Sequence, residues 1–331
     1  MYKFILSTLL FTVIFFPIAT LGQVTYDVEN FSDDYSGKIY FSDTTEVFSK
    51  GWIAIFDKKT NKQIIFEASE ELSFDAQAHG NKIIANIQQL PYGEQSHILY
   101  NDFNFDGLKD FAIMDGQNSC YHGPSYKIYL ASSEGFKLND NFTELAQGYC
   151  GMFEVDTTTK TIHTMLKSGC CWHQFSEFKV INNIPVEIKS LTESNFDGFI
   201  TEYSEGKLIN GKMVETNYKI LSLYLDSTNI ILSYELKNKK KMHIIKTENI
   251  LHYAFLDSAD KIELHHMDNF KYSAKTNTLK FTYLKTEYTI SNDRISIKTP
   301  KRTREIFSAP NTQMGKLENL RVEKFDNVMM E

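Results

Sequence analysis

The sequence predicts an all-β protein, β-propeller-like with about five short antiparallel blades, or a propeller with a smaller β domain. Short apolar segments separated by turn residues recur along the chain. No long segment with the 3.6-residue period of a helix interrupts them. Aromatic residues make up 14% of the 331 residues, with 25 Phe and 18 Tyr, a bias typical of strands.

Individual hairpins follow from this pattern. Residues 52–56 and 64–66 are apolar and flank a polar turn at 57–61. Residues 175–180 alternate in polarity, turn at Asn182 and Asn183, and return as residues 184–188. Residues 221–225 and 230–234 are expected to pair across 226–229. Further short strands are predicted at 270–272, 279–283, 288–290 and 295–297.

These elements predict five segments. Residues 1–22 form a signal peptide, and 23–94 form N-terminal β strands. Residues 95–190 form a calcium-loop propeller core, and 191–299 form C-terminal β strands. Residues 300–331 show little periodicity and are predicted to be a loosely ordered tail.

The N-terminus and the net charge together predict the compartment. Lys3 precedes a short apolar run that is broken at Pro17 and ends near Gly22, which is the pattern of a secretory signal peptide; a retained anchor is the alternative. No Cys follows that could accept a lipid. The mature chain is therefore predicted to be periplasmic or secreted, with no membrane span after cleavage. A net charge of −7 argues against a nucleic-acid partner.

Four cysteines in an exported chain suggest disulfide bonds, and four cysteines allow three connectivities. We favour a bridge between Cys120 and Cys150. Cys170 and Cys171 are adjacent, so they pair with each other as a vicinal disulfide or each reach a different partner. A zinc site is the alternative because His173 follows Cys171 by two residues, although the usual C-x2–4-C spacing is absent.

The most specific motif runs from residue 102 to residue 110. Side-chain oxygens stand at its positions 1, 3, 5 and 9, contributed by Asp102, Asn104, Asp106 and Asp110. Alternate residues of a tight loop point inward, so these donors can converge on one hard cation. The spacing therefore predicts a structural Ca²⁺ site.

Two further residues complete the predicted loop. Gly107 permits the sharp turn, and Leu108 can offer its backbone carbonyl to the ion. The loop is not an EF-hand, since Ile113 stands where Glu is required and the flanking segments are strand-like. A strand–loop–strand unit resembles the FG-GAP or VCBS type of propeller repeat. An Asx-rich turn without metal remains the alternative.

Four segments together carry a wider resemblance: residues 102–113, 123–130, 151–156 and 168–173. They resemble a family of exported bacterial β-propeller proteins that includes periplasmic immunity proteins inhibiting lysozyme-like effectors. The resemblance covers residues 95–190 and implies a propeller fold, a calcium site and a hydrolase as partner. The chain departs from lipoprotein relatives in lacking a lipid-accepting Cys.

The functional hypothesis is an exported binding protein that blocks the cleft of a lysozyme-like hydrolase. Its partner-binding side chains are predicted beside Gly-rich loops, where ordinary packing is the alternative for each: Tyr121, His122, Tyr126, Trp172 and His173. The sequence predicts no enzyme, because no G-x-S-x-G, H-E-x-x-H or P-loop pattern occurs. A carbohydrate-binding or surface-structural β module without inhibitory activity is the other alternative.

Overall fold

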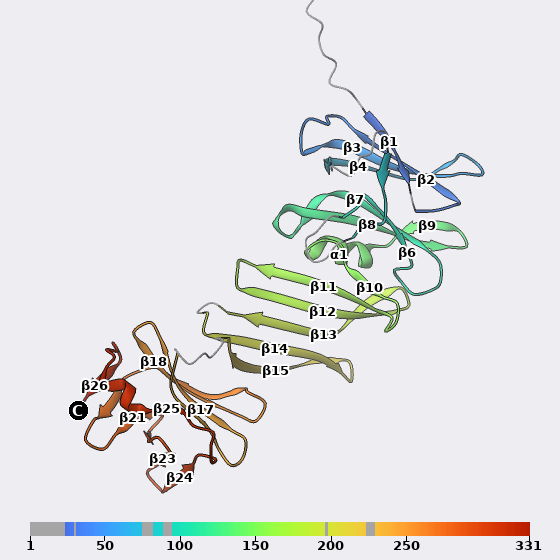
Figure 1. Cartoon of the computed structure of the whole chain (residues 1–331). Helices are drawn as coiled ribbons and strands as arrows, with labels where there is room; N and C mark the ends of the chain where they lie inside the picture. The colour runs from blue at the N-terminus through green and yellow to red at the C-terminus, as the bar shows by residue number, and fades with distance from the viewer. Residues whose placement is uncertain (1–23, 30, 75–81, 89–94, 196–197, 223–228) are drawn as a thin grey trace, which may run out of the picture. The chain divides into compact units, whose positions relative to one another are not determined.

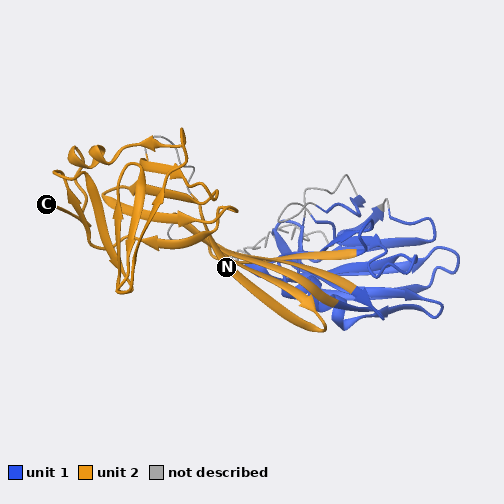
Figure 2. Cartoon of the chain, turned by 90° about the horizontal axis from the view of Figure 1, so that it is seen from below, with its two compact units in different colours: residues 1–160, 180–185 blue, residues 161–179, 186–331 orange. Residues whose placement is uncertain are grey.

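The computed structural model describes residues 24–29, 31–74, 82–88, 95–195, 198–222 and 229–331. Within these ranges the strands form five sheets, which confirms the all-β class. The chain divides into two compact units (Figure 2): unit 1 holds residues 1–160 and 180–185, and unit 2 holds 161–179 and 186–331.

Of the predictions made from the N-terminus, the structure bears only on the absence of a membrane span. The predicted signal peptide, residues 1–22, lies outside the described residues. Across the described ranges, no helix combines the length and the apolar character that crossing a membrane requires.

Unit 1 contains two sheets. The first has the order β4-β3-β2-β1-β5, in which only the β1–β5 pair is parallel. Its strands are β1 (Val24–Glu29), β2 (Tyr35–Phe41), β3 (Phe48–Asp57), β4 (Gln63–Ser73) and β5 (Lys82–Ile84). The β3–β4 pair confirms the hairpin predicted at residues 52–66.

The second sheet of unit 1 is an antiparallel meander of the order β6-β7-β8-β9. Its strands are β6 (Ile98–Asn101), β7 (Asp110–Ser119), β8 (Gly123–Ser132) and β9 (Gly135–Leu138). The short helix η1 (Cys120–His122) connects β7 to β8. The strand β10 (Glu154–Asp156) follows later in the unit.

Unit 1 also contains a helix that the sequence analysis did not predict, α1 (Asp140–Gly148). Asn139 caps it by accepting a hydrogen bond from the Phe142 backbone amide at 3.1 Å. Phe142, Leu145 and Ala146 are buried, at the i, i+3, i+4 spacing of one helix face. A single helix of nine residues gives too short a periodic segment to stand out among strands.

The core of unit 1 is rich in aromatic rings from both sheets. Phe111 on β7 is fully buried, and its ring lies 4.5 Å from that of Tyr100 and 4.8 Å from that of Phe136. Phe31 and Tyr35 approach the same ring edge-on, at 5.9 and 5.7 Å. The cluster joins the first sheet to the second, so the β6–β9 meander packs on the first sheet through aromatic rings.

Unit 2 begins with a long antiparallel meander in which β11-β12-β13-β14-β15 follow in chain order (Figure 1). Its strands are β11 (Thr161–Ser168), β12 (Trp172–Ile181), β13 (Ile184–Ser194), β14 (Ile200–Ile209) and β15 (Lys212–Leu221). Asn182 and Asn183 connect β12 to β13 with φ of 52° and 59°, as the sequence predicted for this turn.

The remainder of unit 2 is two antiparallel-rich sheets around one core. The orders are β19-β18-β17-β16-β25 and β24-β23-β22-β21-β20-β26. The strands of the first are β16 (Ile230–Glu235), β17 (Lys241–Thr247), β18 (Ile250–Leu256), β19 (Ile262–His266) and β25 (Met314–Gly315). Those of the second are β20 (Phe270–Ser273), β21 (Thr278–Tyr283), β22 (Thr286–Ile290), β23 (Arg294–Lys298), β24 (Thr303–Phe307) and β26 (Val328–Met330).

The prediction of a loosely ordered tail at residues 300–331 is wrong. This segment contains β24, β25, β26 and the short helix η2 (Leu317–Arg321). Leu317 and Leu320 are buried in the same core as Tyr253 and Phe281. The sparse apolar residues of the tail suffice because the two sheets supply the surface on which they pack.

The predicted segment boundaries also need correction. Residues 95–190 do not form one body, since the division falls at 160–161 and the turn at 180–185 belongs with unit 1. The predicted hairpin of 221–225 with 230–234 lies partly outside the described residues. Its described second strand, β16, pairs with β17 and β25. Periodicity marks strands, but it does not specify which strands share a sheet.

Candidate functional site

The predicted calcium loop connects β6 to β7, so strands flank it on both sides as expected. Asn101 and Asp110 are register partners at the base of the hairpin. Phe105 and Gly107 have φ of 65° and 90°, the left-handed region that Gly adopts without strain. The sharp turn therefore falls at the predicted position.

The side chains of the loop turn inward and bind its own backbone. Asp102 accepts hydrogen bonds from the amides of Asp106 at 3.2 Å and Gly107 at 2.8 Å. Asp106 accepts one from the Leu108 amide at 2.8 Å. Asn104 accepts one from the Asp106 amide at 3.2 Å and donates its own amide to the Asp106 carboxylate at 2.9 Å. These bonds define an Asx-type loop with its acidic groups on the inside.

Asp110 is fully buried and links the loop to β8. Its two carboxylate oxygens accept hydrogen bonds from the Phe103 and Ala131 amides, both at 2.8 Å. Burial raises the pKa of the Asp110 carboxyl to about 7, against the lowering effect of the two amides; the carboxylates of Asp106 and Asp102 add to the rise. The loop thus concentrates negative charge around a desolvated carboxylate.

The donor chemistry of this loop fits a hard cation. Three carboxylates, one amide oxygen and the Leu108 carbonyl are oxygen ligands of the type that Ca²⁺ prefers. Within the described ranges, no Lys or Arg forms an ion pair with Asp102, Asp106 or Asp110. No group of three or more His, Cys, Asp or Glu side chains in the described part of the chain is arranged as a metal cluster. In this structure the carboxylates of Asp102, Asp106 and Asp110 accept hydrogen bonds from backbone amides.

One partner of the loop was missed by the sequence analysis. The Asn104 side-chain amide also donates to the Asn183 side-chain oxygen at 3.0 Å. Asn183 lies in the β12–β13 turn, which belongs to unit 1 although it follows Asn104 by 79 residues. The sequence predicted a turn at Asn182 and Asn183, but the contact of Asn183 with Asn104 depends on the fold.

The four cysteines form two disulfides, Cys120–Cys150 and Cys170–Cys171. The first confirms the favoured bridge, and the second selects the vicinal alternative. Because both sulfurs of the second pair are bonded to each other, they are not thiolate ligands for zinc. Two disulfides indicate an oxidising compartment.

We name as the tip surface the exposed side chains of two segments: Val47 and Phe48 at the start of β3, and Tyr121 and His122, which directly follow the disulfide-bonded Cys120. Tyr121 and His122 are consecutive residues with φ of 55° and 59°, a strained conformation for residues other than Gly. The exposed fractions of Val47, Phe48 and Tyr121 are 67%, 41% and 62%. The His122 ring contacts the Phe48 ring at 5.2 Å, and its Nε2 lies 3.0 Å from the Glu71 carboxylate.

The other predicted partner-binding residues lie elsewhere. Tyr126 is fully buried and donates its hydroxyl to the Ser96 carbonyl at 2.9 Å, so its prediction as a partner-binding side chain is wrong. Tyr126 lies at a position of β8 whose side chain points into the core. Its closeness to a Gly-containing loop in the sequence does not reveal which face of the strand it occupies. Trp172 and His173 are half-buried on β12 in unit 2, and His173 Nδ1 lies 3.1 Å from Glu193. They do not belong to the unit that carries Tyr121 and His122.

The fold and the site define a disulfide-bonded all-β protein of antiparallel meanders with an acidic loop between two strands. The chain matches no family model and no curated protein. Its structure is similar to a Type IV secretion system related protein of Xanthomonas, with 20% identity and a TM-score of 0.45, over 57% of this chain and 92% of that one.

Two further solved structures are similar over more of the chain. The Dos1 propeller is 9% identical with a TM-score of 0.22, over 92% of this chain and 69% of that one. TolB from Acinetobacter baumannii is 10% identical with a TM-score of 0.21, over 86% and 68%. All three TM-scores lie below 0.5, so these likenesses carry no argument about fold, partner or activity.

Proposed function

We propose that this chain is an exported, calcium-stabilised β-propeller-like binding protein that acts as an immunity-type inhibitor of a lysozyme-like hydrolase. The observation that carries the proposal is the tip surface. Val47, Phe48 and Tyr121 are exposed, the His122 ring contacts the Phe48 ring, and the Cys120–Cys150 disulfide directly precedes the strained pair Tyr121 and His122. A rigid aromatic anchor loses little conformational entropy on binding, which is the property of an interface hot spot.

The chemistry of the tip surface suits insertion into a polar, cleft-shaped partner. Tyr121 combines a flat apolar ring with a hydroxyl that can hydrogen-bond inside a cleft. The Glu71 carboxylate beside His122 and the net charge of −7 complement a basic enzyme and increase its association rate. The resemblance of the sequence to periplasmic immunity proteins supports a muramidase as the partner.

Replacing Tyr121 with alanine is expected to weaken inhibition of a cognate muramidase at least tenfold, because a central aromatic anchor contributes about 2 kcal/mol or more. The measurement is the inhibition constant against hen egg-white lysozyme and a panel of effector-type muramidases. Tyr121→Phe keeps the ring and is expected to retain most of the affinity.

Phe66→Ala provides a matched control, since Phe66 is 49% exposed on unit 1 but lies outside the tip surface. The proposal fails if the wild-type chain neither inhibits nor binds any muramidase of the panel. Retention on insoluble peptidoglycan without any inhibition supports the carbohydrate-binding alternative instead.

Calcium is proposed to stabilise unit 1 through Asp102, Asn104, Asp106, Leu108 and Asp110. When bound, the ion would supply positive charge that offsets the three carboxylates. The backbone amides of Phe103 and Ala131 orient the Asp110 carboxylate through hydrogen bonds, and burial keeps this carboxylate away from water. The role is structural, and no catalytic step is assigned to it.

Adding calcium to chelator-treated protein is expected to raise the melting temperature of unit 1 by about 5–10 °C at a hundredfold excess over Kd, which corresponds to about 2.7 kcal/mol. Differential scanning calorimetry with and without 1,2-diaminoethane-tetraacetate measures it. The double variant Asp102→Asn, Asp106→Asn should lose the response, whereas Asp27→Asn on β1 should keep it. A melting temperature indifferent to calcium in the wild-type chain excludes this role.

A further inference from the structure

The turn between β21 and β22, in unit 2, places a leucine in a strained backbone conformation. Tyr283 and Thr286 are register partners, so Leu284 and Lys285 form a two-residue hairpin turn. Their φ values are 44° and 65°, in the left-handed region. Turns of this kind favour Asn and Gly, because the Cβ of other residues crowds the backbone there. Leucine is therefore an unfavourable choice for this position.

Other two-residue turns of unit 1 and unit 2 follow the usual preference. Asn182–Asn183 connects β12 to β13, and Asn210–Gly211 connects β14 to β15. All four residues have positive φ, which Asn and Gly adopt readily. Leu284 differs from them and is 80% exposed, so burial within the chain does not offset its strain. A strained and exposed apolar side chain indicates a contact with something outside the protein.

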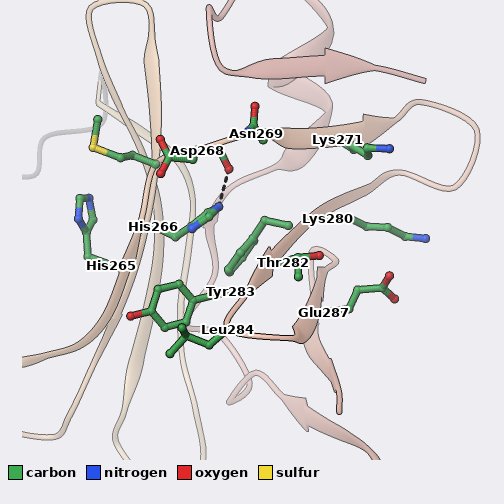
Figure 3. A pocket seen from close by; sticks show the side chains of 12 residues that line it. His265, His266, Asp268, Asn269, Lys271, Lys280, Thr282, Tyr283, Leu284 and Glu287 are labelled. Atoms are coloured by element: carbon green, nitrogen blue, oxygen red, sulfur yellow. Dashed lines mark hydrogen bonds between the residues drawn. The ribbon is translucent and has the colours of Figure 1, made fainter. Parts of the chain in front are cut away.

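Two neighbours extend the apolar surface around Leu284. Tyr283 lies beside it at the end of β21 and is 40% exposed (Figure 3). Met267 is 42% exposed and lines the same depression, of about 650 Å³, as Leu284. Tyrosine combines an apolar ring with a polar hydroxyl, which suits the boundary between water and hydrocarbon. The apolar side chains of this end of the sheet are thus gathered around the turn.

The turn between β23 and β24 lies at the same end of the sheet. Strands β21 to β24 are consecutive antiparallel neighbours, so their first and third turns lie at one end. Glu287 on β22 and Lys298 on β23 are register partners close to these two turns. The Thr299 hydroxyl donates to the Arg302 carbonyl at 3.0 Å and so closes the third turn. The two turns are therefore neighbours, and the second of them is held by its own hydrogen bonds.

These two turns present cations beside the exposed leucine. We name as the sheet-end surface their exposed side chains: Leu284, Lys285, Lys298, Lys301 and Arg302. In the part of the chain that the structure describes, none of its four cations forms an ion pair. Asp268 and Glu287 line the depression beside Leu284, so the cations remain in excess. The charge of this surface is opposite to the net charge of −7 of the whole chain.

We propose that the sheet-end surface binds the surface of a membrane that contains anionic phospholipids. The four cations would contact headgroup phosphates, and Leu284 would enter the boundary between headgroups and acyl chains. A soluble anionic polymer would need only the cations and would leave the leucine exposed, so the leucine favours a lipid surface. This contact lies in unit 2, whereas the tip surface lies in unit 1, so it goes beyond the proposed inhibition.

The test is cosedimentation of the full chain with lipid vesicles. Vesicles of phosphatidylglycerol and phosphatidylcholine in equal parts are expected to bind the chain at about 0.1 M salt, and to release it at about 1 M, where charges are screened within about 3 Å. Vesicles of phosphatidylcholine alone should bind at least tenfold more weakly. The double variant Lys301→Glu, Arg302→Glu should weaken binding to the anionic vesicles tenfold or more.

Leu284→Asn separates membrane insertion from folding. Asn adopts positive φ readily, so the melting temperature of this variant should equal or exceed that of the wild type. Binding to the anionic vesicles should nevertheless fall about fivefold, because the apolar side chain is lost. A purely structural role of Leu284 predicts no such loss of binding.

Two exposed lysines at the opposite end of the same sheet provide a matched control. Lys275 lies in the turn between β20 and β21. Lys316 precedes Leu317, whose amide donates to the Asn292 side chain in the turn between β22 and β23. The double variant Lys275→Glu, Lys316→Glu makes the same change in net charge and should bind the vesicles within about twofold of the wild type. Tyr121→Ala in unit 1 should also bind them normally while it loses inhibition.

Melting temperatures confirm that each variant is folded before its binding is compared. The proposal is overturned if the wild-type chain does not bind the anionic vesicles at about 0.1 M salt. It is equally overturned if Leu284→Asn binds them as the wild type does, or if the control double variant loses as much binding as Lys301→Glu, Arg302→Glu. Binding of soluble dextran sulfate that depends on Lys301 and Arg302, without binding of vesicles, assigns the surface to an anionic polymer instead.

Discussion

Replacing Phe111 with alanine is expected to lower the free energy of unfolding of unit 1 by about 3–5 kcal/mol. The side chain is fully buried and contacts the rings of Phe31, Tyr35, Tyr100 and Phe136. Removing it deletes apolar contacts and leaves a cavity that rigid neighbouring rings cannot fill. Because the ring joins the two sheets of unit 1, its loss is also expected to loosen the base of the acidic loop at residues 102–110.

The measurement is urea unfolding followed by the fluorescence of Trp52, which lies in unit 1. The chain has two Trp, so the background variant Trp172→Phe removes the signal of unit 2. Phe111→Leu retains most of the volume and should cost less than about 1.5 kcal/mol. Phe66→Ala, at an exposed position, should cost less still. A Phe111→Ala loss no larger than that of Phe66→Ala would contradict the described core.

The second large effect is expected from the double variant Cys120→Ser, Cys150→Ser. The bridge spans 30 residues, and the loop-closure relation assigns about 3–4 kcal/mol of stability to a loop of this length. The bridge also directly precedes the strained pair Tyr121 and His122, so under the proposed function the variant should inhibit the proposed muramidase partner more weakly than its loss of stability alone explains.

The second disulfide of the chain provides a matched control for the loss of the Cys120–Cys150 bridge. The double variant Cys170→Ser, Cys171→Ser removes a bridge between adjacent residues, for which the same relation gives only about 1 kcal/mol. Calorimetry of both double variants compares the two losses, and inhibition assays compare the tip surface. Equal losses in the two variants, or unchanged inhibition without Cys120–Cys150, would count against this account.

Local sequence patterns predicted most of the strands and turns that the structure shows. Strand alternation at residues 52–66 and the Asn182–Asn183 turn are confirmed, because side-chain period and turn chemistry act over a few residues. α1 was missed, since its nine residues give too little periodicity. The tail was misjudged because its order comes from burial of Leu317 and Leu320 against sheets formed by earlier residues.

Some features of the candidate site could be predicted from the sequence, and others could not. The calcium-loop spacing and the Cys120–Cys150 bridge could be inferred from residue types and their separation. The exposure of Tyr121 and the burial of Tyr126 could not, because both follow Gly-rich or turn residues and differ only in which face their strand or loop presents. The Asn104–Asn183 contact joins positions 79 residues apart and required the fold.

By itself, the sequence determined the strand-rich class, the loop with its oxygen donors and the disulfide-permissive chemistry, because each is set by residue type and short-range spacing. Only the tertiary structure decided the division into two units, the exposed tip surface and the Asn104–Asn183 contact. These features arise where segments distant in the chain pack together, and packing depends on the shape of both partners.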